Sequence, residues 1–165
     1  MIKTIKIGGI EDLFVVLGAD FDHIKQTVSD HSVIIVENKT WNEGISSSIK
    51  IGLENIENEF DSVVIFVVDQ PFLTKELIQK FIVRYESLKP VMMATKVNNQ
   101  ICHPVLFSKQ FYDDLKSLHG DQGGKKLFSH KDVDYFEWLD ERLLLDIDTI
   151  DDYQKFLQSS DSLSS

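Results

Sequence analysis

Cysteine, arginine and long apolar runs are all scarce in this sequence of 165 residues. The single cysteine, Cys102, excludes an intrachain disulfide and fits a reducing compartment, which predicts a cytoplasmic protein. With two arginines and a formal net charge of −10, the chain is a poor candidate for binding nucleic acid or an anionic membrane. No stretch has the length and apolarity of a transmembrane helix, and the first residues show no signal-peptide pattern.

The composition that is present is ordinary for a globular domain. Hydrophobic residues make up 42% of the chain and charged residues 27%, and there is no internal repeat. The length suits one domain with a sizeable core and is short for two. We expect a single domain over residues 1–158, followed by a disordered Ser-rich tail over residues 159–165.

Alternating short apolar runs and helical patterns predict the fold class. The run Val63–Val68 has no polar residue, which is typical of a central strand buried on both faces. Further strands are predicted over residues 13–17, 33–36, 91–94, 105–107, 133–138 and 143–147. Helices are predicted at the end of 1–10 and over 21–28, 45–59, 75–85, 108–118, 125–128 and 149–157. The helix over 75–85 has an apolar stripe, and Thr149 with Asp152 resembles a capping box for the last helix. This alternation favours a three-layer α/β sandwich around a mixed, mainly parallel sheet.

A carboxylate follows the predicted central strand directly. Asp69 comes after Val68, and Pro71 keeps the chain extended beyond it. Open α/β sheets bind ligands beyond the carboxyl ends of their strands, and Mg²⁺ is commonly held there by one or two carboxylates together with substrate phosphates. Asp69 is therefore a candidate metal ligand, with an ordinary strand-end or capping aspartate as the alternative.

Two further stretches have residues suited to ligand binding. Gly44–Ser48 opens a predicted helix, where amides and hydroxyls can receive a base edge or an anion; the alternative is that Ser46 or Ser47 only caps the helix. His103 precedes Pro104 and could contact a substrate, or could be a loop or core hydrogen-bonding residue. Cys102 has no basic neighbour in sequence and is interpreted as a packing residue.

Two stretches nearer the C-terminus could also bind charged groups. Gly120–Lys126 combines glycines with two lysines, although it lacks the spacing of a phosphate-binding P-loop and could be a plain turn. Asp146 and Asp148 share one face of a predicted extended segment, where a cation could compensate their repulsion. Alternatively, the negative charges of the two aspartates stabilise the N-terminus of the following helix.

In this order, the motifs resemble the MobA-like nucleotidyltransferase family, and within it most closely the MocA type, the molybdenum cofactor cytidylyltransferases. The matching segments are Val15–Ala19, Asn42–Ser48 with Gly52 and Leu53, Asp69–Phe72, His103–Phe107, Gly120–Gly123, and Asp146–Thr149 with Asp152 and Tyr153. The resemblance covers nearly the whole chain. It implies a Rossmann-like nucleotidyltransferase fold that transfers NMP from an NTP, with CTP favoured, to the terminal phosphate of molybdopterin and releases pyrophosphate.

The resemblance also assigns roles to residues. Asp69 and Asp148 match catalytic, Mg²⁺-binding aspartates. The residues expected to bind the nucleotide are Gly44, Ser46, Ser47, Ser48, Gln70 and Pro71. Those expected to bind the molybdopterin-type acceptor are His103, Gly120, Asp121, Gly123 and Lys125. A second copy of the chain or a molybdoenzyme would be the protein partner.

One departure from the family pattern motivates other hypotheses. Family members start with a strand and a Gly-rich loop that grips the triphosphate, and nothing in this chain matches that loop. We therefore expect the first strand of the sheet to be missing. The alternative function is a truncated, non-catalytic domain that binds a nucleotide, a pterin or a protein. A receiver-like domain phosphorylated at Asp69 is weaker, because Leu17–Asp20 offers only one carboxylate for an acidic pair.

Overall fold

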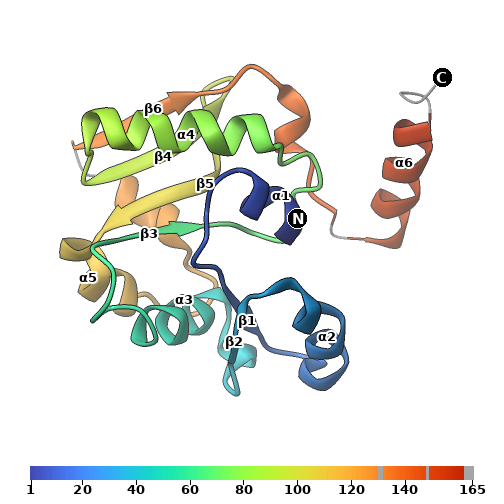
Figure 1. The fold of residues 1–165 in the computed structure, drawn as a ribbon, viewed down its shortest axis with the longest axis horizontal. Coiled ribbons are helices and arrows are strands. Elements are labelled where there is room, and N and C mark those ends of the chain that lie inside the picture. Colours follow the sequence, from blue (N-terminus) through green and yellow to red (C-terminus); the bar gives the residue numbers. More distant parts are fainter. Residues whose placement is uncertain (130–131, 148, 162–165) are drawn as a thin grey trace.

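The strands form two separate sheets in the computed structural model, which describes residues 1–129, 132–147 and 149–161. The first sheet pairs β1 (Phe14–Leu17) with β2 (Ile34–Glu37) in parallel. The second has the order β3-β5-β4-β6 (Figure 1). Its strands are β3 (Ser62–Ile65), β4 (Met92–Val97), β5 (Gln100–Ser108) and β6 (Val133–Glu137). In this sheet β5 runs antiparallel to both β3 and β4, whereas β6 is parallel to β4.

Helices cover both faces of the larger sheet. The α-helices are α1 (Ile2–Ile7), α2 (Phe21–Val28), α3 (Ile45–Glu54), α4 (Lys75–Leu88), α5 (Tyr112–Lys116) and α6 (Ile150–Asp161). Short 3₁₀ turns cover Ser29–His31, Trp41–Glu43, Lys109–Phe111, Gly124–Ser129 and Glu141–Leu144. Figure 1 shows α4 on one face and α3 with α5 on the other. No described helix is both long enough and apolar enough to cross a membrane.

Alternating residues of β4 divide the core into two layers. Met93 and Val97 pack in the cluster that contains Phe81 of α4, whereas Met92 and Ala94 pack in the cluster that contains Leu53 of α3. Period-two alternation along β4 accounts for this division, because successive side chains point to opposite faces. The three-layer α/β arrangement with mixed strand pairing expected from the sequence is therefore confirmed, because parallel and antiparallel pairings are both present.

The predicted central strand Val63–Val68 is wrong in its extent and in its place. The strand ends at Ile65, its residues are only half-buried, and it is an edge strand of the described four-stranded sheet. The pairing of Ile65 with Val105 would next bring Phe66 opposite Pro104, which has no N–H to donate. The ladder stops there, and Val68 is 89% exposed.

Several other boundaries differ from the expectation. The helix predicted over 45–59 ends at Glu54, and only turns follow it. The helix predicted over 108–118 is a 3₁₀ turn joined to the short helix α5. The predicted strand over 143–147 is wrong, because Glu141–Leu144 forms a 3₁₀ turn. The strand predicted at 105–107 is longer, since β5 pairs with both β3 and β4.

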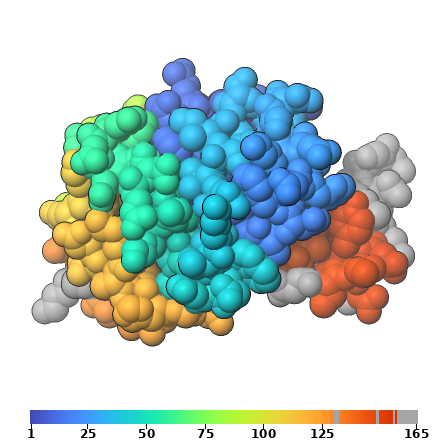
Figure 2. Space-filling model, turned by 90° about the horizontal axis from the view of Figure 1, so that it is seen from below, coloured from blue at the N-terminus to red at the C-terminus, as the bar shows by residue number. Residues whose placement is uncertain are grey.

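The capping box predicted before the last helix is confirmed. The backbone N–H of Thr149 donates to Asp152 Oδ2 at 3.1 Å, and the N–H of Asp152 donates to Thr149 Oγ1 at 3.2 Å. The helix α6 continues to Asp161, so residues 159–161, expected in a disordered tail, are helical. Residues 162–165 of that tail lie outside the described residues. Figures 1 and 2 both place α6 at one side of the molecule, with Phe156 against Phe72 at 5.3 Å between ring centroids.

Candidate functional site

A cavity of about 1520 Å³ lies between the two sheets. Consecutive residues of both facing segments, residues 13–17 and 62–69, line it. Because successive side chains of a strand point to opposite faces, uninterrupted lining means that the edges of β1 and β3 face the cavity. Neither of these edges pairs with another described strand. The volume exceeds that of a typical small-molecule pocket, so the cavity can hold a nucleotide and more.

Asp69 lines this cavity four residues after the end of β3 at Ile65. Its backbone carbonyl accepts a hydrogen bond from the N–H of Ile147 at 2.9 Å. Its carboxylate oxygen Oδ1 is buried and has no hydrogen-bond partner among the described residues. A buried carboxylate oxygen without a donor is costly, and a cation is one way to compensate it. Asp69 therefore fits a hard divalent metal ion.

The second expected metal ligand, Asp148, lies outside the described residues. Its neighbour Ile147 donates its backbone N–H to the Asp69 carbonyl. The described chain therefore lies beside Asp69 immediately before position 148. No group of three or more His, Cys, Asp or Glu side chains that could hold a metal occurs among the described residues. Mg²⁺ does not need one, because it retains waters and substrate oxygens beside one or two carboxylates.

The start of α3 forms a tight polar turn below the cavity. Gly44 precedes the helix with φ 94° and ψ −179°, a conformation that is essentially restricted to glycine. Ser47 Oγ donates to the Gly44 carbonyl at 2.8 Å. Ser46 and Ser47 are buried and do not line the cavity, whereas Ser48 does. The structure thus separates the three serines that the sequence grouped together.

The buried residue Asn38, which was not among the predicted site residues, holds this turn in place. Its Nδ2 donates to Ser47 Oγ at 2.9 Å and to Ser48 Oγ at 3.0 Å. Asn38 directly follows the end of β2 at Glu37, whereas Asp69 comes four residues after the end of β3. A polar residue immediately after a predicted strand was the available signal, because ligand sites of open α/β sheets lie beyond strand ends.

The glycine-rich loop packs against the same turn. The N–H of Ser46 donates to the Gly120 carbonyl at 3.1 Å, and a Cβ on Gly44 would overlap the Gly120 backbone. Asp121, Gly123 and Lys125 line the cavity beside this contact, whereas Gly120 does not. The expected nucleotide turn and the expected acceptor loop are therefore in direct contact.

His103 lines the cavity from β5. Burial lowers the pKa of His103 to about 4, and the positive charge of Lys125 adds to this shift. His103 is consequently neutral near pH 7 and can offer a neutral ring nitrogen to a ligand. Burial raises the pKa of the neighbouring Cys102 thiol to about 11, so this cysteine is not an activated nucleophile, which agrees with its interpretation as a packing residue.

Two residues that were predicted to bind the nucleotide, Gln70 and Pro71, do not line the cavity. Gln70 is 5% exposed, and its Nε2 donates to the Leu143 carbonyl at 3.1 Å. The bond from Gln70 ties the chain after β3 to the turn that precedes Ile147, which supports the position of Asp69.

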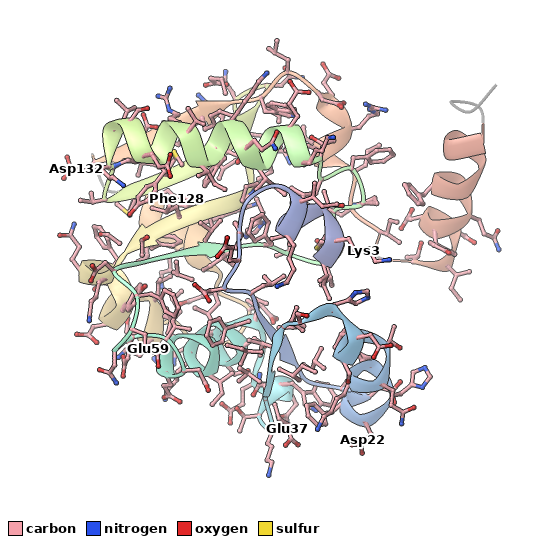
Figure 3. All side chains as sticks on the ribbon, in the orientation of Figure 1. Lys3, Asp22, Glu37, Glu59, Phe128 and Asp132 are labelled. Carbon is pink, nitrogen blue, oxygen red and sulfur yellow. The ribbon has the colours of Figure 1, made fainter. Side chains whose placement is uncertain are left out.

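A lysine that the sequence analysis did not single out also faces the site. Lys3 of α1 lines the cavity, and Figure 3 labels it at the edge of that short helix. The only signal available in the sequence was its place in a short basic segment, Lys3 with Lys6. Lys3 adds a positive charge to a cavity lining that also contains Lys89, Lys125 and Lys126.

Comparison with known proteins identifies the family and the fold. The family model described as the MobA-like NTP transferase domain matches residues 1–135. No curated protein matches the chain. Rv0371c from Mycobacterium tuberculosis has a similar structure, with a TM-score of 0.77 and 23% identity over 94% of this chain and 80% of that one. A structure of Rv0371c in complex with manganese is similar as well.

Two archaeal structures share the fold at lower identity. A nucleotidyl transferase from Methanothermobacter (Mth528) has a TM-score of 0.75 and 16% identity, covering 94% of this chain and 76% of that one. The molybdopterin-guanine dinucleotide biosynthesis protein A from Archaeoglobus fulgidus has a TM-score of 0.64 and 15% identity, covering 89% of this chain and 78% of that one.

The α/β layers and the similarity to these solved structures define a nucleotidyltransferase-type fold. Because the family model covers well over half of the sequence, the chain belongs to the MobA-like NTP transferase domain family.

Proposed function

We propose that the protein is a nucleotidyltransferase that transfers NMP, with CMP favoured over GMP, to the terminal phosphate of a molybdopterin-type acceptor and releases pyrophosphate. The observation that carries the proposal is Asp69, whose buried carboxylate oxygen lacks a donor at the wall of a cavity large enough for two substrates. Membership of an NTP transferase family supports the reaction class. The favoured CTP and the acceptor rest on the motif resemblance.

Asp69 and Asp148 are proposed to hold Mg²⁺. The bond from Ile147 to the Asp69 carbonyl supports this pairing, because it anchors the residue next to position 148 at the strand end. When bound, the ion would neutralise phosphate charge and fix the geometry for in-line transfer. The manganese complex of Rv0371c shows that a structurally similar protein takes a divalent ion.

The remaining residues divide between the two substrates in this proposal. The turn Gly44–Ser48 with Gln70 and Pro71 serves the nucleotide, Ser48 by direct contact and the buried residues by supporting the walls. His103 and the loop Gly120–Lys125 serve the acceptor, with Lys125 placed to attract its phosphate. The contact between Ser46 and Gly120 supports a site in which the two substrates meet.

The test measures pyrophosphate release from CTP in the presence of Mg²⁺ and molybdopterin, with GTP as the comparison. We expect Asp69→Asn to lower the rate by about 100-fold or more, because an amide cannot replace the charge of the carboxylate. The matched control is Asp61→Asn, at the opposite end of β3 and outside the cavity lining, which should retain full activity. Equal loss in both variants, or full activity in Asp69→Asn, would contradict the proposal.

A second candidate is a non-catalytic domain that binds a nucleotide, a pterin or a protein. The observation that favours it is the pair of strand edges on β1 and β3 that have no partner strand in the described chain. Binding of CTP without pyrophosphate release would establish this function in place of the first. Unpaired edges also favour self-association, so sedimentation of the purified protein tests the predicted homodimer. A cytoplasmic location and a molybdoenzyme partner stay predictions.

A further inference from the structure

The side chain of Asn38 has all of its hydrogen-bonding capacity in use. It is 2% exposed. Its Oδ1 accepts from the backbone N–H of Thr40 at 3.0 Å and from Thr40 Oγ1 at 3.2 Å. Its Nδ2 donates to Ser47 Oγ and Ser48 Oγ. Because a backbone N–H can only donate, the contact with Thr40 requires the oxygen of Asn38 to face Thr40 and its NH₂ group to face the serines.

This orientation determines where the two serine hydroxyls can send their protons. Each serine oxygen accepts from Asn38, so its own proton must go elsewhere. Ser47 donates to the Gly44 carbonyl at 2.8 Å, which uses its single proton inside the turn. The proton of Ser48 has no acceptor among the described residues, and Ser48, unlike Ser47, lines the cavity. Asn38 thus leaves Ser48 as a hydrogen-bond donor available to a ligand.

The surroundings of Ser48 indicate which part of a nucleotide it would meet. Ile45 and Gly52, three residues before Ser48 and four after it, line the cavity next to Ser48 on α3, and Ile49 lines the cavity as well. These residues carry no charge, and an apolar surface beside one neutral donor suits a base better than a triphosphate. The charged residues of the cavity lining, Asp69, Asp121 and Lys125 among them, come from other elements, and the carboxylate of Asp121 beside Gly44 disfavours a phosphate at this turn.

We infer that Asn38 is a positioning residue that holds Ser48 as the hydrogen-bond donor to an acceptor atom of the nucleotide base, a carbonyl oxygen or a ring nitrogen. This inference rests on the proposed function, since it assumes that the cavity binds a nucleotide. It divides the serine turn into Ser47, which closes the turn, and Ser48, which contacts the base. It also adds a residue, Asn38, that itself touches no ligand.

The experiment measures binding of CTP and of inorganic triphosphate, each with Mg²⁺, by calorimetry. Ser48→Ala should weaken CTP binding by about 3- to 10-fold, as expected for one net hydrogen bond, and leave triphosphate binding unchanged. Ser48→Thr keeps the hydroxyl and should retain the affinity of the wild type. Ser117→Ala is the control: this serine is exposed, donates to the Asp114 carbonyl and does not line the cavity, so the variant should preserve CTP affinity.

Asn38 is tested through its dependence on Ser48. Asn38→Ala should weaken CTP binding, and the double variant Asn38→Ala/Ser48→Ala should bind CTP no more weakly than Ser48→Ala alone. A purely structural role of Asn38 would instead give additive losses and would weaken triphosphate binding too, which would overturn the inference. If Asn38→Ala fails to fold, the Ser48 variants still test the inference. Unchanged CTP affinity in Ser48→Ala would overturn the inference.

The outcomes separate the inference from the proposed function. Wild-type binding of CTP with no effect of Ser48→Ala overturns the inference and leaves the nucleotidyltransferase proposal standing. CTP binding that depends on Ser48 but leads to no pyrophosphate release supports the inference and contradicts the catalytic proposal. Absence of CTP binding by the wild type overturns both.

Discussion

The middle of the β3-β5-β4-β6 sheet is packed much more completely than the region between β3 and β1. In the middle of the sheet, Met92, Met93, Val105 and Phe107 are 0% exposed. On the β1–β3 side, the strands are mostly half-buried, and their edges face a cavity of about 1520 Å³. Asp69, Ser48 and His103 all lie on the wall of this cavity. The packed half therefore serves as a scaffold, and the candidate site lies where packing is incomplete.

The largest expected contrast between the halves is in stability. Phe81 is 1% exposed and contacts Phe136 edge-to-face, so Phe81→Ala should lower the free energy of unfolding by about 3–5 kcal/mol. Val68→Ala, at a side chain 89% exposed, should change it by less than about 0.5 kcal/mol. Urea unfolding of both variants measures the contrast. A comparable loss in the two variants would mean that the chain after β3 is packed after all.

The contact between the serine turn and the glycine-rich loop should show a smaller effect. Gly44→Ala forces a side chain into a conformation that favours glycine and into the Gly120 backbone, which should cost about 1–3 kcal/mol. Gly123→Ala is the matched control, because no atom lies within 4 Å of a Cβ at that position. Thermal unfolding of the two variants compares them. Equal melting temperatures would show that the two loops are not held together.

A pH dependence of stability also distinguishes the cavity wall. His103 has a pKa of about 4 in the folded protein and about 6.5 when unfolded. Between these values the unfolded chain binds more protons, so the contribution of neutral His103 is fully present above pH 6.5 and is lost as the pH falls toward 4. The stability advantage of the wild type over His103→Gln should therefore shrink between pH 7 and pH 4.5 in urea titrations. An advantage that stays constant would place His103 in contact with solvent.

Sequence patterns were sufficient for the scaffold. The apolar stripe of α4 and the capping pair Thr149 and Asp152 depend on neighbouring residues in the sequence, and both are present as expected. The end of β3 depends instead on Pro104, a residue of another strand, so no property of the run Val63–Val68 could reveal it. Burial deduced from apolar composition alone placed this strand at the centre of the sheet, although it has a neighbour on one side only among the described strands.

The sequence indicated several residues of the candidate site but not the hydrogen bonds that connect them. Asp69 and His103 could be selected because each stands beside a local signal, a strand end or a proline. The separation of Ser47 from Ser48 could not be foreseen, because it depends on hydrogen bonds from Asn38, nine and ten residues away in the sequence. Contacts of this kind form only when a parallel strand and its following helix are in place.

The division of the strands into two sheets also affects which part of the domain can open on its own. Each sheet is built from one uninterrupted stretch, residues 14–37 for β1 and β2 and residues 62–137 for the other four strands. Neither ladder contains a hydrogen bond to the other, so the smaller sheet can open while the larger one stays closed. Amide protons of Phe14–Leu17 should consequently exchange with solvent through local opening, whereas those of Met92–Val97 require the whole domain to unfold.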